Sequence, residues 1–188
     1  MRPDMPNIQL SHLGICVENI ARMEEFYTKV LGFTVTDRGS TLGLDLVFMS
    51  RDPRHHHEIV LSSGRPPGLG RNTITPVFGP VINQISFSLG TLSELQQMYR
   101  YLQAVHPGEY LCANHGVSWS IYFDDPEGNK IEIFVDTVWY ITQPVLEPMD
   151  LMRPEAEILA ETQALCAKGQ NFQSIAAWRE KIGMVMAG

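Results

Sequence analysis

An internal repeat constrains the fold of this chain more than any other feature. The segment HLGICVENIARMEEFY, which begins at His12, aligns with QISFSLGTLSELQQMY, which begins at Gln84. At this offset of 72 residues, Ile15 falls on Phe87, and apolar positions coincide along the rest of both segments. A pattern that recurs in this way indicates a duplicated supersecondary unit, so both copies are expected to share one fold.

Each copy has the pattern of a strand followed by a helix. Apolar residues first alternate and then recur three and four positions apart, which is typical of a strand and then an amphipathic helix. Asn19 and Thr91 lie where the helix N-caps are expected, and Thr91 forms a capping-box pattern with Glu94. Gly32 lies where the first helix is expected to end.

Three further strands are predicted after each helix, separated by turn-forming residues. They cover 33–37, 44–50 and 56–62 in the first copy, and 110–113, 118–123 and 130–136 in the second. The order βαβββ, found twice, predicts an α+β fold in which paired modules form a curved mixed-sheet cup. We expect one domain over 7–136, with modules at 7–62 and 81–136 and an irregular connection over 63–80 that is rich in Gly and Pro.

The pattern changes after residue 136, and 137–188 are predicted to be a C-terminal helical extension. Pro154 suits the first turn of one helix, Gly169 its end, and Ser174 the cap of the next. Apolar residues such as Leu159 are expected on one packing face. We interpret the extension as scaffold, although it could instead close over the site.

The composition argues against several classes of partner. Fourteen Lys and Arg against 21 Asp and Glu give a net charge of −7, and the basic residues are scattered, which disfavours nucleic acid or an anionic membrane. No apolar run approaches the roughly 18 residues of a membrane span. The three cysteines match no metal or redox pattern, and the N-terminus lacks the apolar region of a secretion signal. We therefore expect an acidic cytoplasmic protein with reduced thiols.

Three polar residues lie among apolar neighbours on equivalent predicted strands: His12, Gln84 and Glu132. A buried strand does not carry such side chains without partners, because an unpaired polar group costs free energy. Each alone is explained by a hydrogen bond or by an outward-facing position. Together, on the first strand of each copy and the last strand of the second, they predict a metal site in one pocket.

These residues belong to three segments that resemble the vicinal oxygen chelate superfamily, also called the glyoxalase/bleomycin resistance/dioxygenase proteins. The segments are SHLGICVENIARMEEFYTKVLGF, NQISFSLGTLSELQQMYRYL and HGVSWSIYFDDPEGNKIEIFVD. The third is the most specific, since the superfamily often has a Tyr-Phe strand, an Asp-Pro-x-Gly-Asn turn and a Glu ligand. The resemblance covers about residues 8–136, and it implies that His12, Gln84 and Glu132 are the metal ligands.

Within the superfamily the chain is most similar to the type I extradiol dioxygenases, which cleave catechol rings. This resemblance implies Fe(II) or Mn(II), held by two His and one carboxylate with three positions open. It assigns His57 as the acid/base that deprotonates the diol, and Tyr122 and His115 as groups that hydrogen-bond the substrate. The histidine triplet around His57 could also be solvated, and Tyr122 could be a core aromatic.

One departure from the dioxygenase pattern leaves a second interpretation open. Gln84 stands where the family has its second histidine, and an amide oxygen is a harder and weaker ligand than imidazole. Glutamine ligands occur in glyoxalase I and in methylmalonyl-CoA epimerase of the same superfamily. Glu58, 74 residues before Glu132, could complete such a set. That set would imply Ni(II) or Zn(II) and lyase or isomerase chemistry.

The two interpretations assign opposite directions to Glu58 and its neighbour His57, because adjacent residues on a strand face opposite ways. A third possibility is a binding protein of the bleomycin-resistance type, which holds a small molecule without reacting it. Retention of His12 and Glu132 argues against this class. All three interpretations predict a small-molecule ligand in the cup, and the resemblance implies a homodimer.

Overall fold

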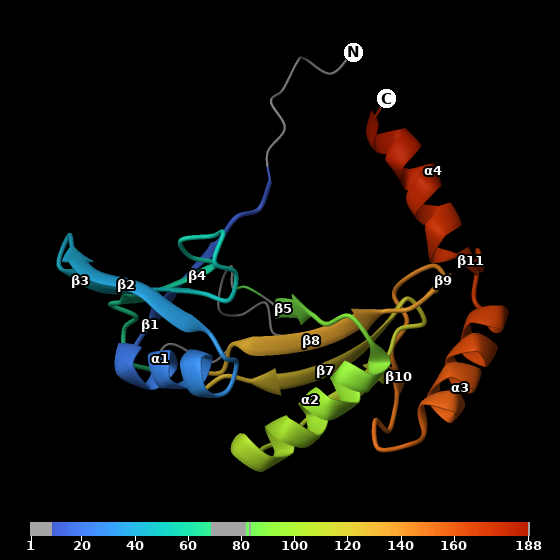
Figure 1. The fold of residues 1–188 in the computed structure, drawn as a ribbon, viewed down its shortest axis with the longest axis horizontal. Coiled ribbons are helices and arrows are strands. Elements are labelled where there is room, and N and C mark those ends of the chain that lie inside the picture. Colours follow the sequence, from blue (N-terminus) through green and yellow to red (C-terminus); the bar gives the residue numbers. More distant parts are fainter. Residues whose placement is uncertain (1–8, 69–81, 83, 188) are drawn as a thin grey trace. The chain divides into compact units, whose positions relative to one another are not determined.

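The structure is a computed structural model that describes residues 9–68, 82 and 84–187. Its helices are α1 (Ile20–Lys29), α2 (Leu92–Val105), α3 (Glu155–Lys168) and α4 (Ile175–Ala187). Its strands are β1 (Leu13–Val17), β2 (Thr34–Thr41), β3 (Leu44–Ser50), β4 (Ile59–Ser63), β5 (Ile85–Ser88), β6 (Leu111–Asn114), β7 (Ser118–Asp124), β8 (Lys130–Asp136), β9 (Trp139–Tyr140), β10 (Glu147–Pro148) and β11 (Gln173–Ser174). The chain forms two compact units, and each contains one βαβββ module (Figure 1).

The two main sheets have the same topology. The first has the order β1-β4-β3-β2, and the second has the order β10-β6-β7-β8-β5, so that β5 corresponds to β1 and β8 to β4. The edge strand of each module is parallel to its neighbour: Leu13 lies opposite Ile59 in the first, and Ile85 opposite Ile131 in the second. Both members of the second pair therefore follow their counterparts by the offset of the sequence repeat. The predicted α+β fold with two βαβββ modules is confirmed, whereas the cup stays a prediction.

The helix caps form as the sequence predicts. The Asn19 side chain accepts a hydrogen bond from the backbone N–H of Arg22. Thr91 and Glu94 make both bonds of a capping box at the start of α2. Ser174 caps α4 by accepting from the backbone N–H of Ala177 at 3.1 Å. These bonds satisfy backbone donors that the first turn of a helix leaves without partners.

The strand predictions hold with one informative error. The segments 44–50 and 130–136 match β3 and β8, and the other predicted strands shift at one or both ends. The segment 56–62 was predicted as a strand, but β4 begins only at Ile59, and the preceding residues 51–58 form the turn from β3. The connection at 63–80 lies mostly outside the described residues, as do Asn7 and Ile8 at the expected start of the domain. The division into one domain and an extension stays a prediction.

In the first unit, α1 packs on β3 and β4 through a fully apolar face. Met23, Phe26 and Tyr27 of this face are buried. The turn that contains Glu127 belongs to the same unit, and its carboxylate accepts hydrogen bonds from the backbone N–H groups of Glu18 (2.9 Å) and Asn19 (2.8 Å). A carboxylate at this position also suits the positive end of the helix dipole.

In the second unit, the two faces of the sheet differ in character. Ile131, Ile133 and Val135 of β8 are buried on the face that α2 covers, since α2 packs on β7 and β8. The residues between them on β8, beginning with Glu132, point to the other face. This alternation is the strand pattern expected when one face forms the core and the other carries polar groups.

Residues 137–188 pack against the second module through a buried hydroxyl group. Thr162 of α3 accepts hydrogen bonds from Asn114 Nδ2 and Trp119 Nε1, both at 2.8 Å, and donates to the carbonyl of Ile158 at 2.7 Å. The buried positions of α3 are Ile158, Thr162 and Cys166, whereas Leu159, predicted on the packing face, is 39% exposed. A polar residue therefore occupies the centre of this interface because all of its hydrogen bonds are made.

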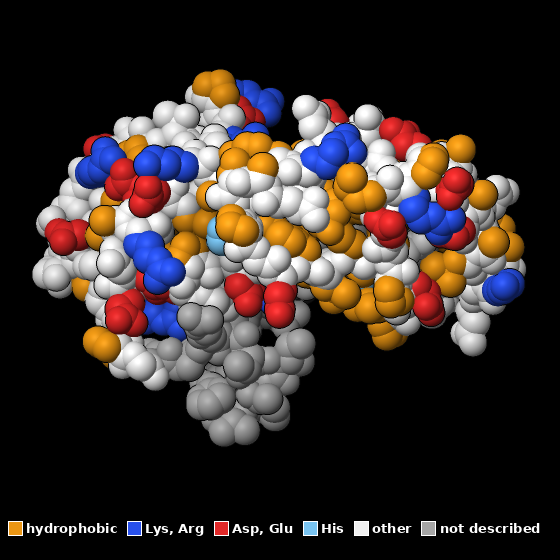
Figure 2. Space-filling model, turned by 90° about the horizontal axis from the view of Figure 1, so that it is seen from below, with side chains coloured by type: hydrophobic (Ala, Val, Ile, Leu, Met, Phe, Trp, Pro, Cys, Tyr) orange, Lys and Arg blue, Asp and Glu red, His pale blue; other side chains and the backbone are white. Residues whose placement is uncertain are grey.

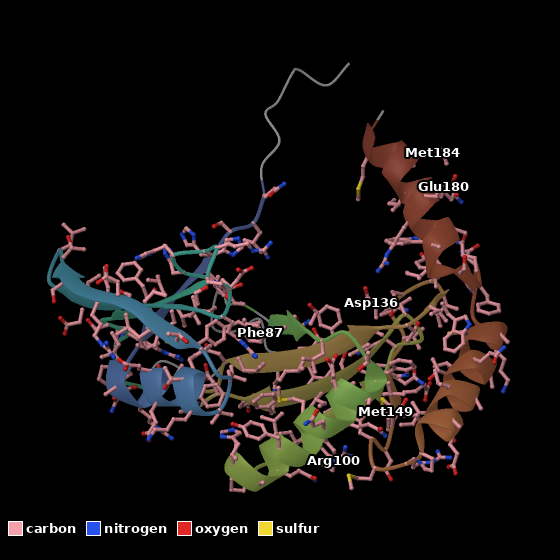
Figure 3. All side chains as sticks on the ribbon, in the orientation of Figure 1. Phe87, Arg100, Asp136, Met149, Glu180 and Met184 are labelled. Carbon is pink, nitrogen blue, oxygen red and sulfur yellow. The ribbon has the colours of Figure 1, made fainter. Side chains whose placement is uncertain are left out.

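The last helix has fewer contacts with the rest of its unit. Trp178 stacks on Tyr140 of β9 with ring centroids 5.0 Å apart, and Arg179 forms an ion pair with Asp136 at 2.7 Å. Beyond these contacts α4 runs away from β9 and β11, and Met184 near its end is 65% exposed (Figure 3). The extension is helical, as predicted, and the short strands β9, β10 and β11 were not predicted.

The charges on the surface show no separation into large regions of one sign. On the face in Figure 2, Lys and Arg side chains alternate with Asp and Glu side chains. No helix in the described part of the chain is long and apolar enough to cross a membrane. The cysteines Cys16, Cys112 and Cys166 are free thiols.

We predict that Thr162→Val destabilises the protein by about 2–4 kcal/mol, because it leaves the Asn114 and Trp119 donors buried without an acceptor. The control is Thr162→Ser, which keeps the hydroxyl and loses one methyl group, at a cost of about 1 kcal/mol. Urea unfolding followed by fluorescence gives both free energies. Equal stability of the two variants would show that the hydroxyl does not hold α3 in place.

Candidate functional site

The polar face of the second sheet brings together a row of side chains from three strands. Ser86 of β5 lies opposite Glu132 of β8, and Glu132 lies opposite Tyr122 of β7. Gln84 directly precedes β5, as His12 directly precedes β1 in the first module. Sheet register, and not only proximity in the sequence, thus positions these groups.

Glu132 is the centre of this row, and its carboxylate is only 7% exposed. Tyr122 donates its hydroxyl hydrogen to Oε1 at 2.5 Å. The Ser86 hydroxyl donates to Oε2 at 2.5 Å, and Gln84 Nε2 donates to the same oxygen at 2.7 Å. Three donors offset the cost of burying a carboxylate, and one lone pair on Oε1 remains for a further partner.

The side-chain amide of Gln84 has its nitrogen committed and its oxygen turned elsewhere. Nε2 contacts Glu132 at 2.7 Å and Ser86 Oγ at 3.1 Å. This pattern assigns the orientation of the amide, because a carbonyl oxygen could not donate to the carboxylate. Gln84 is exposed, so its Oε1 is accessible to a ligand. Together with Oε1 of Glu132, it provides oxygen donors of the kind that divalent metals accept.

Tyr122 connects Glu132 to a histidine. His115 Nε2 lies 3.0 Å from the Tyr122 hydroxyl, and His115 Nδ1 lies 2.5 Å from the carbonyl oxygen of Val145. A carbonyl oxygen only accepts, so Nδ1 carries the hydrogen and donates it. The pKa of Tyr122 is raised, first by burial and then by its bond to Glu132 and the charge of that carboxylate. Tyr122 therefore stays a neutral donor.

A second cluster, within the first unit, contains the two predicted histidines. His12 precedes β1 and His57 precedes β4, and their rings lie 4.3 Å apart between centroids. His56 Nδ1 lies 2.9 Å from His57 Nδ1, and the Phe48 ring lies 5.1 Å from the His57 ring. Partial burial and then the neighbouring imidazoles of His12 and His56 lower the pKa of His57. The lower pKa favours the neutral form, which can accept a proton.

Glu58 does not occupy a position equivalent to Glu132. In the parallel strand pairs, Val60 lies opposite Gly14 as Glu132 lies opposite Ser86, so Val60 is the counterpart of Glu132. The Glu58 carboxylate instead accepts from the backbone N–H of Arg51 at 2.7 Å and from the hydroxyl of Ser50 at 3.2 Å. These bonds commit it to the turn between β3 and β4.

The predicted site residues thus fall into two groups. Gln84, His115, Tyr122 and Glu132 form one network in the second unit, and His12 and His57 lie together in the first. The convergence of His12, Gln84 and Glu132 on one metal stays a prediction. Within the described ranges, no three His, Cys, Asp or Glu side chains gather closely enough to hold a metal ion.

Sequence reasoning missed three contributors to the network in the second unit. Ser86 lies two residues after Gln84, and the strand period could have indicated that both face the same side. The carbonyl of Val145 and the amide of Gln143, which donates to the carbonyl of His115, had no such signal. Backbone groups are the same at every position, so only the structure reveals which one is used.

Comparisons with known proteins agree with this architecture. Two curated relatives from Rhodococcus globerulus are biphenyl-2,3-diol 1,2-dioxygenase 3, 27% identical over 128 residues, and biphenyl-2,3-diol 1,2-dioxygenase 2, 26% identical over 129 residues. Each alignment covers 68% of this chain and 63% of the relative. The chain therefore spans less than two thirds of the length of these relatives.

Solved structures share the fold at low sequence identity. The glyoxylase/bleomycin resistance protein/dioxygenase domain from Frankia sp. EAN1pec superposes with a TM-score of 0.59 at 19% identity, over 70% of this chain and 100% of that domain. The fosfomycin resistance protein FosX from Listeria monocytogenes gives a TM-score of 0.50 at 17% identity, over 71% of this chain and 97% of that protein. These likenesses concern the fold alone.

The family match covers both modules and ends before the extension. Residues 9–133 match the family described as the Glyoxalase/Bleomycin resistance protein/Dioxygenase superfamily. The match includes both parallel edge strands and the Gln84–Glu132 pair, which are the features that position the polar row. This chain belongs to the Glyoxalase/Bleomycin resistance protein/Dioxygenase superfamily.

Proposed function

We propose that this protein is a metal-dependent enzyme of the ring-cleaving dioxygenase type, which acts on a small aromatic molecule with two adjacent hydroxyl groups. The observation that carries the proposal is the connected row His115–Tyr122–Glu132, in which each side chain contacts the next. The biphenyl-2,3-diol dioxygenases among the relatives support the substrate class. Superfamily membership supports the dependence on a metal.

His12, Gln84 and Glu132 would hold a divalent metal, with Fe(II) or Mn(II) expected. One imidazole, one amide oxygen and one carboxylate suit such an ion, although the amide is a harder donor than a second imidazole. When bound, the metal would supply Lewis acidity and the electrons for oxygen chemistry. In this proposal Ser86 and Tyr122 keep the Glu132 carboxylate oriented, since both donate to it.

The remaining residues would bind the diol and move its protons. His57 is suited to accept a proton from a hydroxyl group, because its lowered pKa favours the neutral imidazole. Tyr122 would remain protonated and offer a fixed hydrogen-bonding hydroxyl, since its pKa is raised. His115 would contribute Nε2, because Nδ1 is committed to the carbonyl of Val145.

A glyoxalase- or epimerase-like lyase or isomerase with Ni(II) or Zn(II) is the second candidate. Its support is Gln84, which is a ligand type of that class. We rank it lower because the fourth ligand it needs, Glu58, is bonded to the turn through Arg51 N and Ser50 Oγ. A non-catalytic protein that binds a small molecule is the third candidate.

The first test is the metal content and activity of the protein purified without a His tag. We expect iron or manganese near one equivalent, and cleavage of biphenyl-2,3-diol under air that is detected by the absorbance of the ring-opened product. In Glu132→Gln the charge of the ligand is lost, so metal content and activity should both fall at least tenfold, equivalent to about 1.4 kcal/mol or more.

Nickel or zinc without ring cleavage would favour the second candidate. A protein that holds no metal yet binds diols would favour the third. Both outcomes contradict the proposal, provided that circular dichroism shows the folded state.

The second test separates the dioxygenase from the glyoxalase interpretation through two variants. Gln84→His should raise Fe(II) affinity about tenfold or more, since imidazole binds Fe(II) better than an amide oxygen, by roughly 1–3 kcal/mol. Glu58→Gln should leave metal content unchanged, because Glu58 serves the turn between β3 and β4. Iron titration measures both. Loss of metal in Glu58→Gln without a gain of iron in Gln84→His would contradict the preferred interpretation.

We further propose that the protein is a homodimer, on the strength of superfamily membership alone. Light scattering should give twice the chain mass of 21.2 kDa at working concentration. A mass equal to one chain would remove the proposal.

A further inference from the structure

The histidine of the polar row is held by a segment outside the family match. Residues 143–145 lie beyond position 133, where the match ends, and they contact both the ring and the backbone of His115. We propose that Gln143 is a positioning residue, through which the C-terminal extension sets the orientation and the tautomer of His115. The consequence for catalysis rests on the proposed function, whereas the tautomer can be measured without it.

Gln143 connects His115 to Val145 by a pair of hydrogen bonds. Its Nε2 donates to the carbonyl oxygen of His115 at 2.8 Å, and its Oε1 accepts from the backbone N–H of Val145 at 3.1 Å. Because one side chain fixes both backbones, the Val145 carbonyl stays within reach of the imidazole. That carbonyl oxygen lies 2.5 Å from His115 Nδ1.

This geometry selects one tautomer of the neutral imidazole. The Val145 carbonyl can only accept, so the hydrogen is on Nδ1 and the lone pair is on Nε2. Nε2 lies 3.0 Å from the hydroxyl of Tyr122, whose single hydrogen is donated to Glu132 at 2.5 Å. The lone pair of Nε2 is therefore left to accept a hydrogen bond from a ligand hydroxyl, which a diol can provide.

The hairpin that carries His115 is fixed to the extension at other points, so the ring rather than the backbone is the part left to be oriented. Thr137 donates its hydroxyl hydrogen to the carbonyl of Gly116 at 2.6 Å. Gly116 has φ of +75°, and a Cβ atom there would lie 2.6 Å from Cδ1 of Ile141. The backbone at residue 116 thus requires glycine and packs directly on the extension.

The test uses the full chain with nitrogen-15 in the histidine rings, at mildly alkaline pH. His115→Asn identifies the His115 signals. The test variant is Gln143→Met, which has a similar length but no donor or acceptor, and Gln143→Glu keeps only the acceptor for Val145. The matched control is Gln163→Met, since Gln163 is an exposed glutamine of α3.

We expect the wild type and Gln163→Met to show His115 protonated on Nδ1. Gln143→Met should show a mixture of tautomers, and Gln143→Glu should lie between these extremes. With biphenyl-2,3-diol as the probe, kcat should fall about tenfold in Gln143→Met with a smaller change in KM, since a slightly misplaced group can cost up to about 100-fold in rate.

Two results separate this inference from the proposed function. An unchanged Nδ1–H tautomer in Gln143→Met, at wild-type thermal stability, overturns the positioning role whatever the enzyme does. A shifted tautomer in a protein that cleaves no diol supports the positioning role and contradicts the proposed function. If the chain cleaves the diol and the tautomer shifts without any change in kcat, the link from Gln143 to catalysis is wrong.

Discussion

The polar face of the second sheet depends on the burial of one carboxylate. Glu132 lies on a central strand among isoleucines, where a charged group is costly unless donors surround it. The register of the sheet supplies two of them, because Ser86 and Tyr122 are its direct neighbours on the adjoining strands. Gln84 supplies the third from the residue before β5. Substitution at any of these positions therefore alters the charge balance of the whole row.

The same requirement orders the groups at a greater distance from the carboxylate. Because Tyr122 donates to Glu132, its oxygen faces His115, and His115 must use its other nitrogen elsewhere. The carbonyl of Val145 fills that need. The row thus starts in the sheet of the duplicated module and ends in the C-terminal extension, which the family match does not cover.

Most of the fold could be predicted from the sequence because its signals are local and repeated. The caps at Asn19 and Thr91 and the strands β3 and β8 follow from residue type and periodicity. The turn before β4 was misread because HHHEIVL looks like a continuous strand, whereas Glu58 draws the backbone at Arg51 into a turn. Leu159 was misassigned because Thr162, with its bonds satisfied, takes the centre of the buried face.

The candidate site was predicted in part, through family resemblance more than through spacing. The association of Gln84 and Tyr122 with Glu132 is found in the structure. The proposed equivalence of Glu58 with Glu132 fails, because a separation of 74 residues differs by two from the true repeat, and the register identifies Val60 instead. Contacts through backbone carbonyls, such as that of Val145, leave no trace in residue identity.

The short strand β10 has a consequence for assembly. It pairs with β6 and covers what would otherwise be the open edge of the second sheet. Its second residue, Pro148, has no N–H to offer to an additional strand. Open edges invite pairing between molecules, and a proline-terminated edge discourages it. Any association of two copies by strand addition would therefore have to avoid this edge, so the extension restricts which sheet continuations, including aggregated ones, the chain can form.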